Sequence, residues 1–230
     1  MNEQEVNAIN EKFEKSHPQE ILEWAIRTFH PRIGLSSSFG AESVGLLHMV
    51  TQIEPSIPVL FINTGHLFRE TIEFSVELKK RFNLNLKEFK ASPDQITSIQ
   101  KKLTDPQNKN GACCDDIKVE LMQKSLEGLD CWIAGVRRSQ SSTRKDIKIV
   151  ESYRSGLVKV HPLANWTPKD LYDYMTKKNL PFHPLWAKGY KSIGCEPCTQ
   201  LPLPGQDERS GRWTGTDKTE CGIHTFLPKQ

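Results

Sequence analysis

Apolar residues along the chain form short runs that alternate with longer segments of helical spacing. The short runs predict strands at residues 32–38, 59–62, 84–89 and 131–136, the first of which runs into a serine turn. The segments between them predict helices at 3–15, 18–29, 41–53 and 67–81, and one that ends at about residue 126. Residues 148–150 and 157–160 predict a hairpin. Strands that alternate with helices predict an α/β fold with a doubly wound, mostly parallel sheet.

Ligands of such sheets bind at the carboxyl ends of the strands, where loops and helix N-termini meet. The loops expected there are residues 36–43, 63–66 and 137–144. Residues 181–220 are rich in proline, glycine and polar residues, which predicts a segment that wraps around the body or moves. We therefore expect a ligand-binding α/β domain at residues 1–200 and a C-terminal tail at residues 201–230.

Composition narrows the class of ligand. With 37% hydrophobic and 26% charged residues, the chain is typical of a globular protein. The net charge of +3 is too small to indicate nucleic acid, but basic residues cluster at 137–145 and at 209–212, which favours a small anionic ligand. The polar residues 1–15 contain no apolar signal region, and no run approaches the ~20 apolar residues of a membrane helix. We expect a soluble, cytoplasmic protein whose cysteines are ligands or nucleophiles.

Four of the six cysteines form two pairs, Cys113-Cys114 and Cys195-x-x-Cys198. Four thiolates suit a [4Fe–4S] cluster or a tetrahedral zinc ion. Zinc sites mostly use spaced cysteines, whereas adjacent thiolates can each bind a different iron of a larger cluster, so the spacing favours the cluster. Buried structural thiols are the remaining alternative.

The other two cysteines have different surroundings. Cys131 lies in an apolar strand and is expected to be a small core residue. Cys221 is an odd thiol on a polar segment that contains glycine, which makes it a candidate nucleophile. Nearby basic residues (Arg209, Arg212 and His224) would lower its pKa. The alternative is an incidental surface cysteine.

Several motifs follow one another along the chain. They are Ser38-Phe39-Gly40-Ala41-Glu42, Asn63-Thr64-Gly65, Cys113-Cys114 with Lys118, Gly135-Val136-Arg137-Arg138, Pro162-Leu163-Ala164-Asn165-Trp166-Thr167, Gly189-Tyr190-Lys191-Ser192-Ile193-Gly194-Cys195-Glu196-Pro197-Cys198-Thr199, Asp207-Glu208-Arg209-Ser210-Gly211-Arg212-Trp213 and Glu220-Cys221-Gly222-Ile223-His224. Together these motifs resemble the assimilatory adenylyl-sulfate reductases of the sulfonucleotide reductase family, and the match is collinear from about Ser36 to His224.

The resemblance implies an adenine-nucleotide α-hydrolase-like fold and an activity. Cys221 would attack the sulfur of adenosine 5′-phosphosulfate, AMP would leave, and thioredoxin or glutaredoxin would expel sulfite from the resulting S-sulfo cysteine. A [4Fe–4S] cluster would be held by Cys113, Cys114, Cys195 and Cys198. Members that act on the 3′-phosphorylated nucleotide generally lack these four cysteines, so the resemblance favours the unphosphorylated substrate; use of the 3′-phosphorylated nucleotide, or of both, is the alternative. It leaves open whether the chain forms a homo-oligomer.

The same resemblance, together with the chemistry of anion binding, predicts the residues that bind the substrate. Backbone N–H groups and hydroxyls of a turn at a helix N-terminus suit a phosphate, and arginine forks suit phosphate and sulfate oxygens. The expected residues are Ser37, Ser38, Gly40, Thr64, Gly65, Lys118, Arg138, Arg144, Arg209 and Arg212.

Two other functions are alternatives to a sulfonucleotide reductase. An ATP-dependent tRNA-modifying enzyme of the same fold would have a Ser-Gly-Gly-x-Asp-Ser loop, but residues 38–43 read Ser-Phe-Gly-Ala-Glu-Ser. A zinc-binding module without activity would have no use for Cys221 or for the arginine clusters. Both therefore explain less of the sequence than a sulfonucleotide reductase does.

Overall fold

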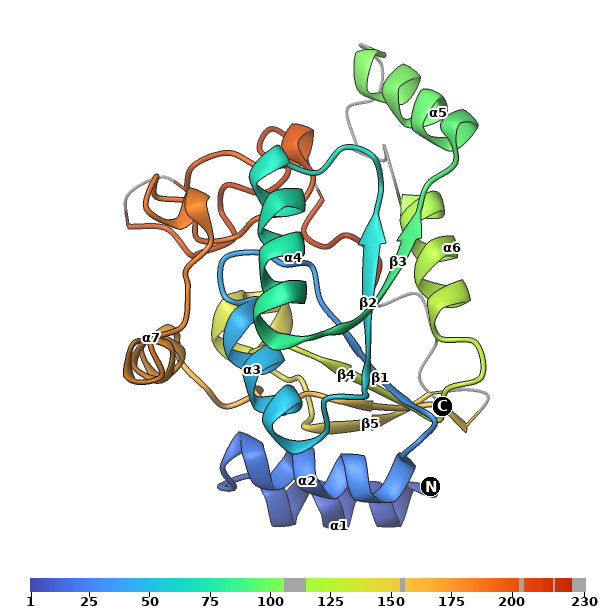
Figure 1. Cartoon of the computed structure of the whole chain (residues 1–230), viewed down its shortest axis with the longest axis vertical. Helices are drawn as coiled ribbons and strands as arrows, with labels where there is room; N and C mark the ends of the chain where they lie inside the picture. Colours follow the sequence, from blue (N-terminus) through green and yellow to red (C-terminus); the bar gives the residue numbers. More distant parts are fainter. Residues whose placement is uncertain (106–114, 154–155, 203–204, 217, 225–230) are drawn as a thin grey trace.

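The protein folds around one six-stranded sheet (Figure 1). The computed structural model describes residues 1–105, 115–153, 156–202, 205–216 and 218–224. The strand order is β3-β2-β1-β4-β6-β5. All neighbouring strands are parallel except β5 and β6, which form the predicted hairpin. The strands are β1 (Ile33–Ser36), β2 (Pro58–Asn63), β3 (Asn85–Lys90), β4 (Cys131–Ala134), β5 (Val150–Ser152) and β6 (Val158–Val160). The doubly wound, mostly parallel sheet is therefore confirmed.

Side chains alternate between the two faces of the sheet, as the pleat of a strand requires. In β4, Cys131 and Ile133 belong to one hydrophobic cluster, whereas Trp132 and Ala134 belong to the other. The first cluster includes side chains of α1 (Glu3–Phe13), α2 (Pro18–Phe29), α3 (Ser43–Ile53), α4 (Arg69–Phe82) and α7 (Pro168–Lys177). The second includes α5 (Pro93–Thr104), α6 (Asp115–Ser125) and parts of the C-terminal segment. Helices thus cover both faces, and the prediction that Cys131 is a core residue is confirmed.

Local capping explains where several helices begin. Pro18 occupies the first turn of α2, where its missing N–H costs nothing, and α2 has the predicted bounds. Helices α5 and α7 were not among the predicted elements. Each begins with a capping box and a proline in its first turn: Ser92 with Gln95 in α5, and Thr167 with Asp170 in α7.

The C-terminal segment from residue 181 wraps around the body, one of the two outcomes expected for it. In Figure 1 its orange and red part lies beside α4. It contains the short 3₁₀ helices η4 (Pro184–Trp186) and η5 (Glu196–Cys198). An isolated bridge between Leu67 and Cys195 attaches it to the body, and one between Thr199 and Arg212 joins two parts of the segment itself. The domain boundary expected at residue 200 stays a prediction. The backbone N–H of Gln200 donates to the carbonyl of Gly211, so a hydrogen bond connects the two sides of that boundary. Within the described parts of the chain, no helix is both long and apolar enough to span a bilayer.

Candidate functional site

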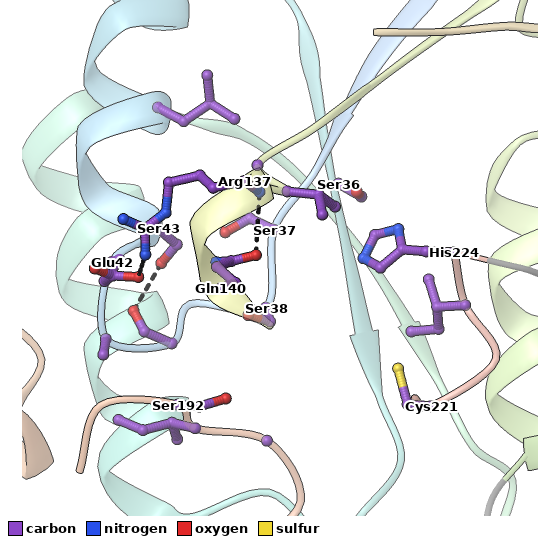
Figure 2. Close-up of a pocket in the computed structure, with 18 of the residues that line it drawn as sticks. Ser36, Ser37, Ser38, Glu42, Ser43, Arg137, Gln140, Ser192, Cys221 and His224 are labelled. Carbon is purple, nitrogen blue, oxygen red and sulfur yellow. Dashed lines mark hydrogen bonds and ion pairs between the residues drawn. The ribbon is translucent and has the colours of Figure 1, made fainter. Parts of the chain in front are cut away.

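A cavity of about 210 Å³ lies at the carboxyl ends of β1 and β4. Its walls come from the turn after β1, the start of α6, the loop after β4 and the C-terminal segment. Eight residues predicted to act on the substrate line it: Ser37, Ser38, Gly40, Lys118, Arg144, Arg209, Arg212 and Cys221. Figure 2 shows Cys221 and His224 on one side, Glu42 and Arg137 on the other, and the serine turn between them. The fold therefore brings together the predicted anion-binding turn and the predicted nucleophile, which lie about 180 residues apart in the sequence.

The turn after β1 is held in place by its own backbone and by one buried ring. The N–H of Ser37 donates to the carbonyl of Leu60 at 3.0 Å, and the N–H of Phe39 donates to the Ser37 hydroxyl at 3.2 Å. Phe39 takes the left-handed conformation, with φ of 49°, and its buried ring packs edge-on against Phe61. A side chain at Gly40 would approach the Ile193 carbonyl to 3.2 Å, so glycine lets the C-terminal segment pass close to the turn.

Cys221 lies partly buried at the edge of the cavity. Burial by itself raises the pKa of the thiol, because it disfavours the charged form. The Lys118 ammonium, the backbone N–H of Ile223 and the guanidinium groups of Arg212 and Arg209 outweigh burial, and the pKa of Cys221 is lowered from its ordinary value. A thiolate is the nucleophilic form of cysteine, so the site favours the reactive state.

The residue before the nucleophile binds two of the predicted arginines. The Glu220 carboxylate accepts two hydrogen bonds from Arg144, through Nε and Nη2, both at 2.7 Å. It also accepts from Nη2 of Arg209 at 3.0 Å and from the Thr143 hydroxyl at 3.2 Å. Although burial opposes it, this set of donors lowers the pKa of Glu220. Two cations at the cavity therefore already hold an anion, which belongs to the protein itself.

Arg137, which was not among the predicted substrate-binding residues, holds two carboxylates at the far side of the cavity. Its side chain is fully buried, its Nη2 donates to Glu42 and to Glu208 (3.1 Å for the latter), and its Nη1 is buried without a partner among the described residues. Glu42 stands at the N-terminus of α3. Burial raises the pKa of Glu42 to about 7; Arg137 opposes this rise, and Glu208 adds to it. The sequence could not predict that Glu42 and Glu208 share one guanidinium, because the two residues are 166 positions apart.

Arg138, by contrast, does not line the cavity, so the geometry does not support its predicted contact with the substrate. Its guanidinium donates to Glu14, to the Asn165 side chain and to the Ile147 carbonyl, on the side of α1. Arg137 has extended backbone in the loop after β4, whereas Arg138 begins the 3₁₀ helix η1 (Arg138–Gln140), so the two side chains leave the chain in different directions. The sequence shows two neighbouring arginines but not which of them points inward, and the inward one is Arg137.

Thr64 and Gly65 also lie outside the cavity lining, next to a predicted cluster ligand. The Thr64 hydroxyl is fully buried and lies 3.2 Å from the sulfur of Cys195. Arg212 connects this region to the cavity, because its Nε donates to the Cys198 carbonyl at 3.1 Å. A side chain at Gly194 would collide with the Arg212 guanidinium at 2.2 Å, so this position must be glycine for the arginine to lie there.

Two of the four predicted cluster ligands are described, and both are buried. Cys195 directly precedes η5 and Cys198 is its last residue, and the N–H of Cys198 donates to the Cys195 carbonyl at 3.0 Å. They share a hydrophobic cluster with Ile117 of α6. Cys113 and Cys114, which directly precede α6 in the sequence, lie outside the described residues. In the part of the chain that the structure describes, no three His, Cys, Asp or Glu side chains meet as a metal site.

Cys131 differs from this pair. It is fully buried in the cluster on the opposite face of the sheet. Burial, with a smaller contribution from Asp130, raises the pKa of its thiol. Cys131 does not line the cavity, and burial keeps its thiol neutral.

Comparisons with known proteins agree with the geometry. Residues 32–201 match the family described as phosphoadenosine phosphosulfate reductase domain. An adenosine 5′-phosphosulfate reductase of Mesorhizobium japonicum is 42% identical over 90% of this chain and 82% of that protein, and one of Bacillus cereus is 38% identical over 96% of both. The crystal structure of a phosphoadenylyl-sulfate reductase from Candida auris, in a phosphate complex, has a TM-score of 0.72 and 26% identity over 85% of this chain and 96% of that one. The resemblance drawn from the motifs is thus confirmed, and the chain belongs to the phosphoadenosine phosphosulfate reductase domain family.

Proposed function

We propose that this protein is an oxidoreductase of sulfate assimilation that reduces adenosine 5′-phosphosulfate to sulfite and AMP. The observation that carries the proposal is Cys221: a thiol with a lowered pKa at a cavity lined by cations, opposite a turn that suits a phosphate. The names of the curated relatives in M. japonicum and B. cereus support the same substrate.

The cavity has walls of two kinds, which match the two ends of the nucleotide. Leu35, Leu46, Leu60 and Ile62 are apolar and suit the flat adenine ring. The cations near Cys221 suit the phosphosulfate, because forked guanidinium donors bind phosphate and sulfate oxygens. Nε of Arg209 is buried and has no partner among the described residues, so a bound oxygen would satisfy it.

In the proposed first step the Cys221 thiolate attacks the sulfur of the substrate. A bond from Sγ to the substrate sulfur forms, the bond from that sulfur to the bridging oxygen breaks, and AMP leaves with the electron pair. The leaving group is a phosphate, which needs positive charge rather than a proton. Lys118 and Arg212 lie close enough to Cys221 to lower its pKa, and they therefore supply that charge at the reacting atoms.

In the proposed second step a dithiol protein of the thioredoxin or glutaredoxin type reduces the S-sulfo cysteine. Its thiolate attacks the Cys221 sulfur, forms a mixed disulfide and expels sulfite with the electron pair. Its second thiol then attacks its own sulfur in that disulfide and releases Cys221 as a thiolate. Because attack requires access to Cys221, the segment that carries this residue has to leave the cavity between the two steps.

We further propose that Cys195 and Cys198, with Cys113 and Cys114, hold a [4Fe–4S] cluster. Two buried cysteines next to the helix that Cys113 and Cys114 precede fit such a group. When bound, the cluster would tie the segments that carry its four cysteines together close to the cavity. Arg212 contacts the Cys198 carbonyl and lines the cavity, so it would transmit the position of the cluster ligands to the anion site.

Replacement of the nucleophile tests the proposed function. Anaerobically purified protein with adenosine 5′-phosphosulfate and no reductant should gain the mass of one sulfo group on the peptide that contains Cys221, and thioredoxin should then release sulfite. Cys221→Ser should abolish both reactions because the thiolate is lost, whereas Cys131→Ser, on the far face of the sheet, should retain them. Sulfite release by Cys221→Ser, or an adduct on another cysteine, would refute the assignment.

A further inference from the structure

A buried lysine lies next to the C-terminal segment. Lysine is almost never fully buried unless its charge is paired, so its position needs a specific explanation. Lys159 of β6 is 1% exposed. Its ammonium lies 4.2 Å from the centre of the Trp132 ring and 5.5 Å from that of Tyr153, which is a cation–π arrangement with both. It also donates hydrogen bonds of 3.3 Å to the Tyr153 hydroxyl and to the main-chain carbonyl of His224. Three of these contacts are made within the sheet, and one is made to the C-terminal segment.

His224 meets this group with its backbone and with its ring. Its carbonyl accepts from Lys159 and from the Tyr153 hydroxyl, the latter at 3.4 Å. Its ring stacks on Trp132 with 5.5 Å between centres and 15° between planes. Burial lowers the pKa of His224 well below its ordinary value, and the nearby Lys159 adds to this, so the stacked imidazole is neutral.

Lys159 is connected to a carboxyl group through Tyr153. The Tyr153 hydroxyl accepts from Lys159 at 3.3 Å and donates to the Glu151 carboxylate at 3.2 Å. Glu151 lies opposite Lys159 in the β5–β6 pair and 3.7 Å from His161. Burial lowers the pKa of His161 to about 4, so this histidine is neutral. The lysine therefore belongs to a hydrogen-bonded network and is not an isolated buried charge.

The position of His224 determines that of the nucleophile, because only two residues separate it from Cys221. The backbone N–H of Ile223, between them, is one of the groups that lower the pKa of Cys221. On the other side of Cys221, Glu220 is held by Arg144 and Arg209. The nucleophile is thus held on both sides. Downstream, the residues that hold His224 (Lys159, Trp132 and Tyr153) do not line the substrate cavity, although His224 itself does.

We propose that Lys159, Trp132 and Tyr153 form a docking site for His224, and that this docking positions Cys221 beside Lys118 and Arg212. Lys159 is thereby a positioning residue for the reaction and makes no contact with the nucleotide. The inference rests on the proposed function for its kinetic consequence, but the docking can be measured without substrate.

The test compares Lys159→Met and His224→Ala with a matched control. Lys159→Met keeps the length of the side chain and removes the ammonium, and His224→Ala removes the stacked ring without touching the sheet. Lys87→Met makes the same change at an exposed lysine of β3. Each protein is alkylated with iodoacetamide over a range of pH, and the rate at Cys221 is followed by peptide mass spectrometry.

Both docking variants should move the pH midpoint of alkylation at Cys221 upward by about one unit, a tenfold smaller thiolate fraction at neutral pH. Their kcat for sulfite release should fall by about tenfold to a hundredfold, as misplacement of a reacting group predicts, while KM for the nucleotide stays nearly unchanged. Lys87→Met should match the wild type in both measurements.

An unchanged alkylation midpoint in a folded His224→Ala protein would overturn the proposal, as would a rise in KM with kcat preserved. If Lys159→Met does not fold, the stack removed in His224→Ala still decides the matter. Absence of sulfite release from the wild type would refute the proposed function instead, and it would leave the alkylation result valid.

Discussion

Glu42 and Glu208 share one guanidinium in a buried place, and this makes their protonation part of the stability of the protein. Burial is the main reason that the pKa of each is raised, and Arg137 only partly opposes it. Ionising both carboxylates puts a second negative charge on one cation, which the low polarity of the site disfavours. One proton is therefore retained near neutral pH, where an exposed pair would have lost both.

The sign of the resulting pH dependence follows from the raised pKa of Glu42. Between about pH 4.5 and pH 7 the folded protein holds a proton that the unfolded chain releases. The free energy of unfolding should therefore decrease as pH rises through this range, by up to about 3 kcal/mol from this residue. Glu42→Gln, which cannot ionise, should lose most of that decrease and should stabilise the protein more at pH 8 than at pH 5.

Denaturant unfolding at pH 5, 6, 7 and 8 measures this difference. Glu77→Gln, at an exposed position of α4, is the matched control and should leave the wild-type slope unchanged. A Glu42→Gln protein that is destabilised equally at pH 5 and pH 8 would contradict the raised pKa.

At the scale of elements, the sequence predicted what depends on local patterns. The sheet strands, five of the helices and the β5–β6 hairpin follow from apolar spacing and turn residues. Helices α5 and α7 were missed, although Ser92 and Thr167 both begin capping boxes. Once such boxes are weighed alongside apolar periodicity, both helices are predictable.

The residues of the site divide in the same way, into those that local patterns predict and those that only the fold brings together. Motifs predicted the residues that line the cavity from the turn after β1 and around Cys221. Arg137, Glu208 and Lys159 were missed because their role depends on partners brought close only by the fold. Which of two adjacent arginines faces inward is decided by the turn from the loop after β4 into η1, and no local pattern in the sequence indicates that.

The two faces of the sheet give a sharp test of the cluster proposal. Cys195→Ser and Cys198→Ser should each lower iron, inorganic sulfide and activity together, because one thiolate ligand is lost. Cys131→Ser, a change of the same chemistry on the other face, should keep its iron and should cost about 1–3 kcal/mol of stability for a buried hydroxyl. Iron and sulfide analysis after anaerobic purification decides it; one equivalent of zinc without sulfide would contradict the cluster.

At the scale of the whole molecule, the charges of the cavity bear on the choice of nucleotide. A 3′-phosphate adds about −1.5 to −2 charges and needs a further cation. Lys145 and His66, basic residues with no predicted contact to the phosphosulfate, do not line the cavity that the described residues form. Of the other cations in its lining, Arg137 is engaged by Glu42 and Glu208, and Lys191 lies over the Trp186 ring at 4.2 Å. Binding a 3′-phosphate would therefore require its desolvation, and few ion pairs would form to offset that cost.

We accordingly expect kcat/KM to be higher for adenosine 5′-phosphosulfate than for its 3′-phosphorylated form, by about tenfold or more, which corresponds to about 1.4 kcal/mol. The two nucleotides are to be compared with one thioredoxin at fixed ionic strength. Equal values, or a higher value for the 3′-phosphorylated nucleotide, would show that the alternative substrate assignment is correct and would leave the chemistry of Cys221 unaffected.

The hold of Arg144 and Arg209 on Glu220 has a consequence for how the site fills and empties. A phosphosulfate that binds these arginines replaces a carboxylate, and a departing product is replaced by the same carboxylate. Each turnover is then an exchange of one anion for another at a fixed set of cations, so the guanidinium groups never stand without a counter-ion in a place of low polarity. The protein carries its own exchangeable ion, one residue away from the atom that does the chemistry.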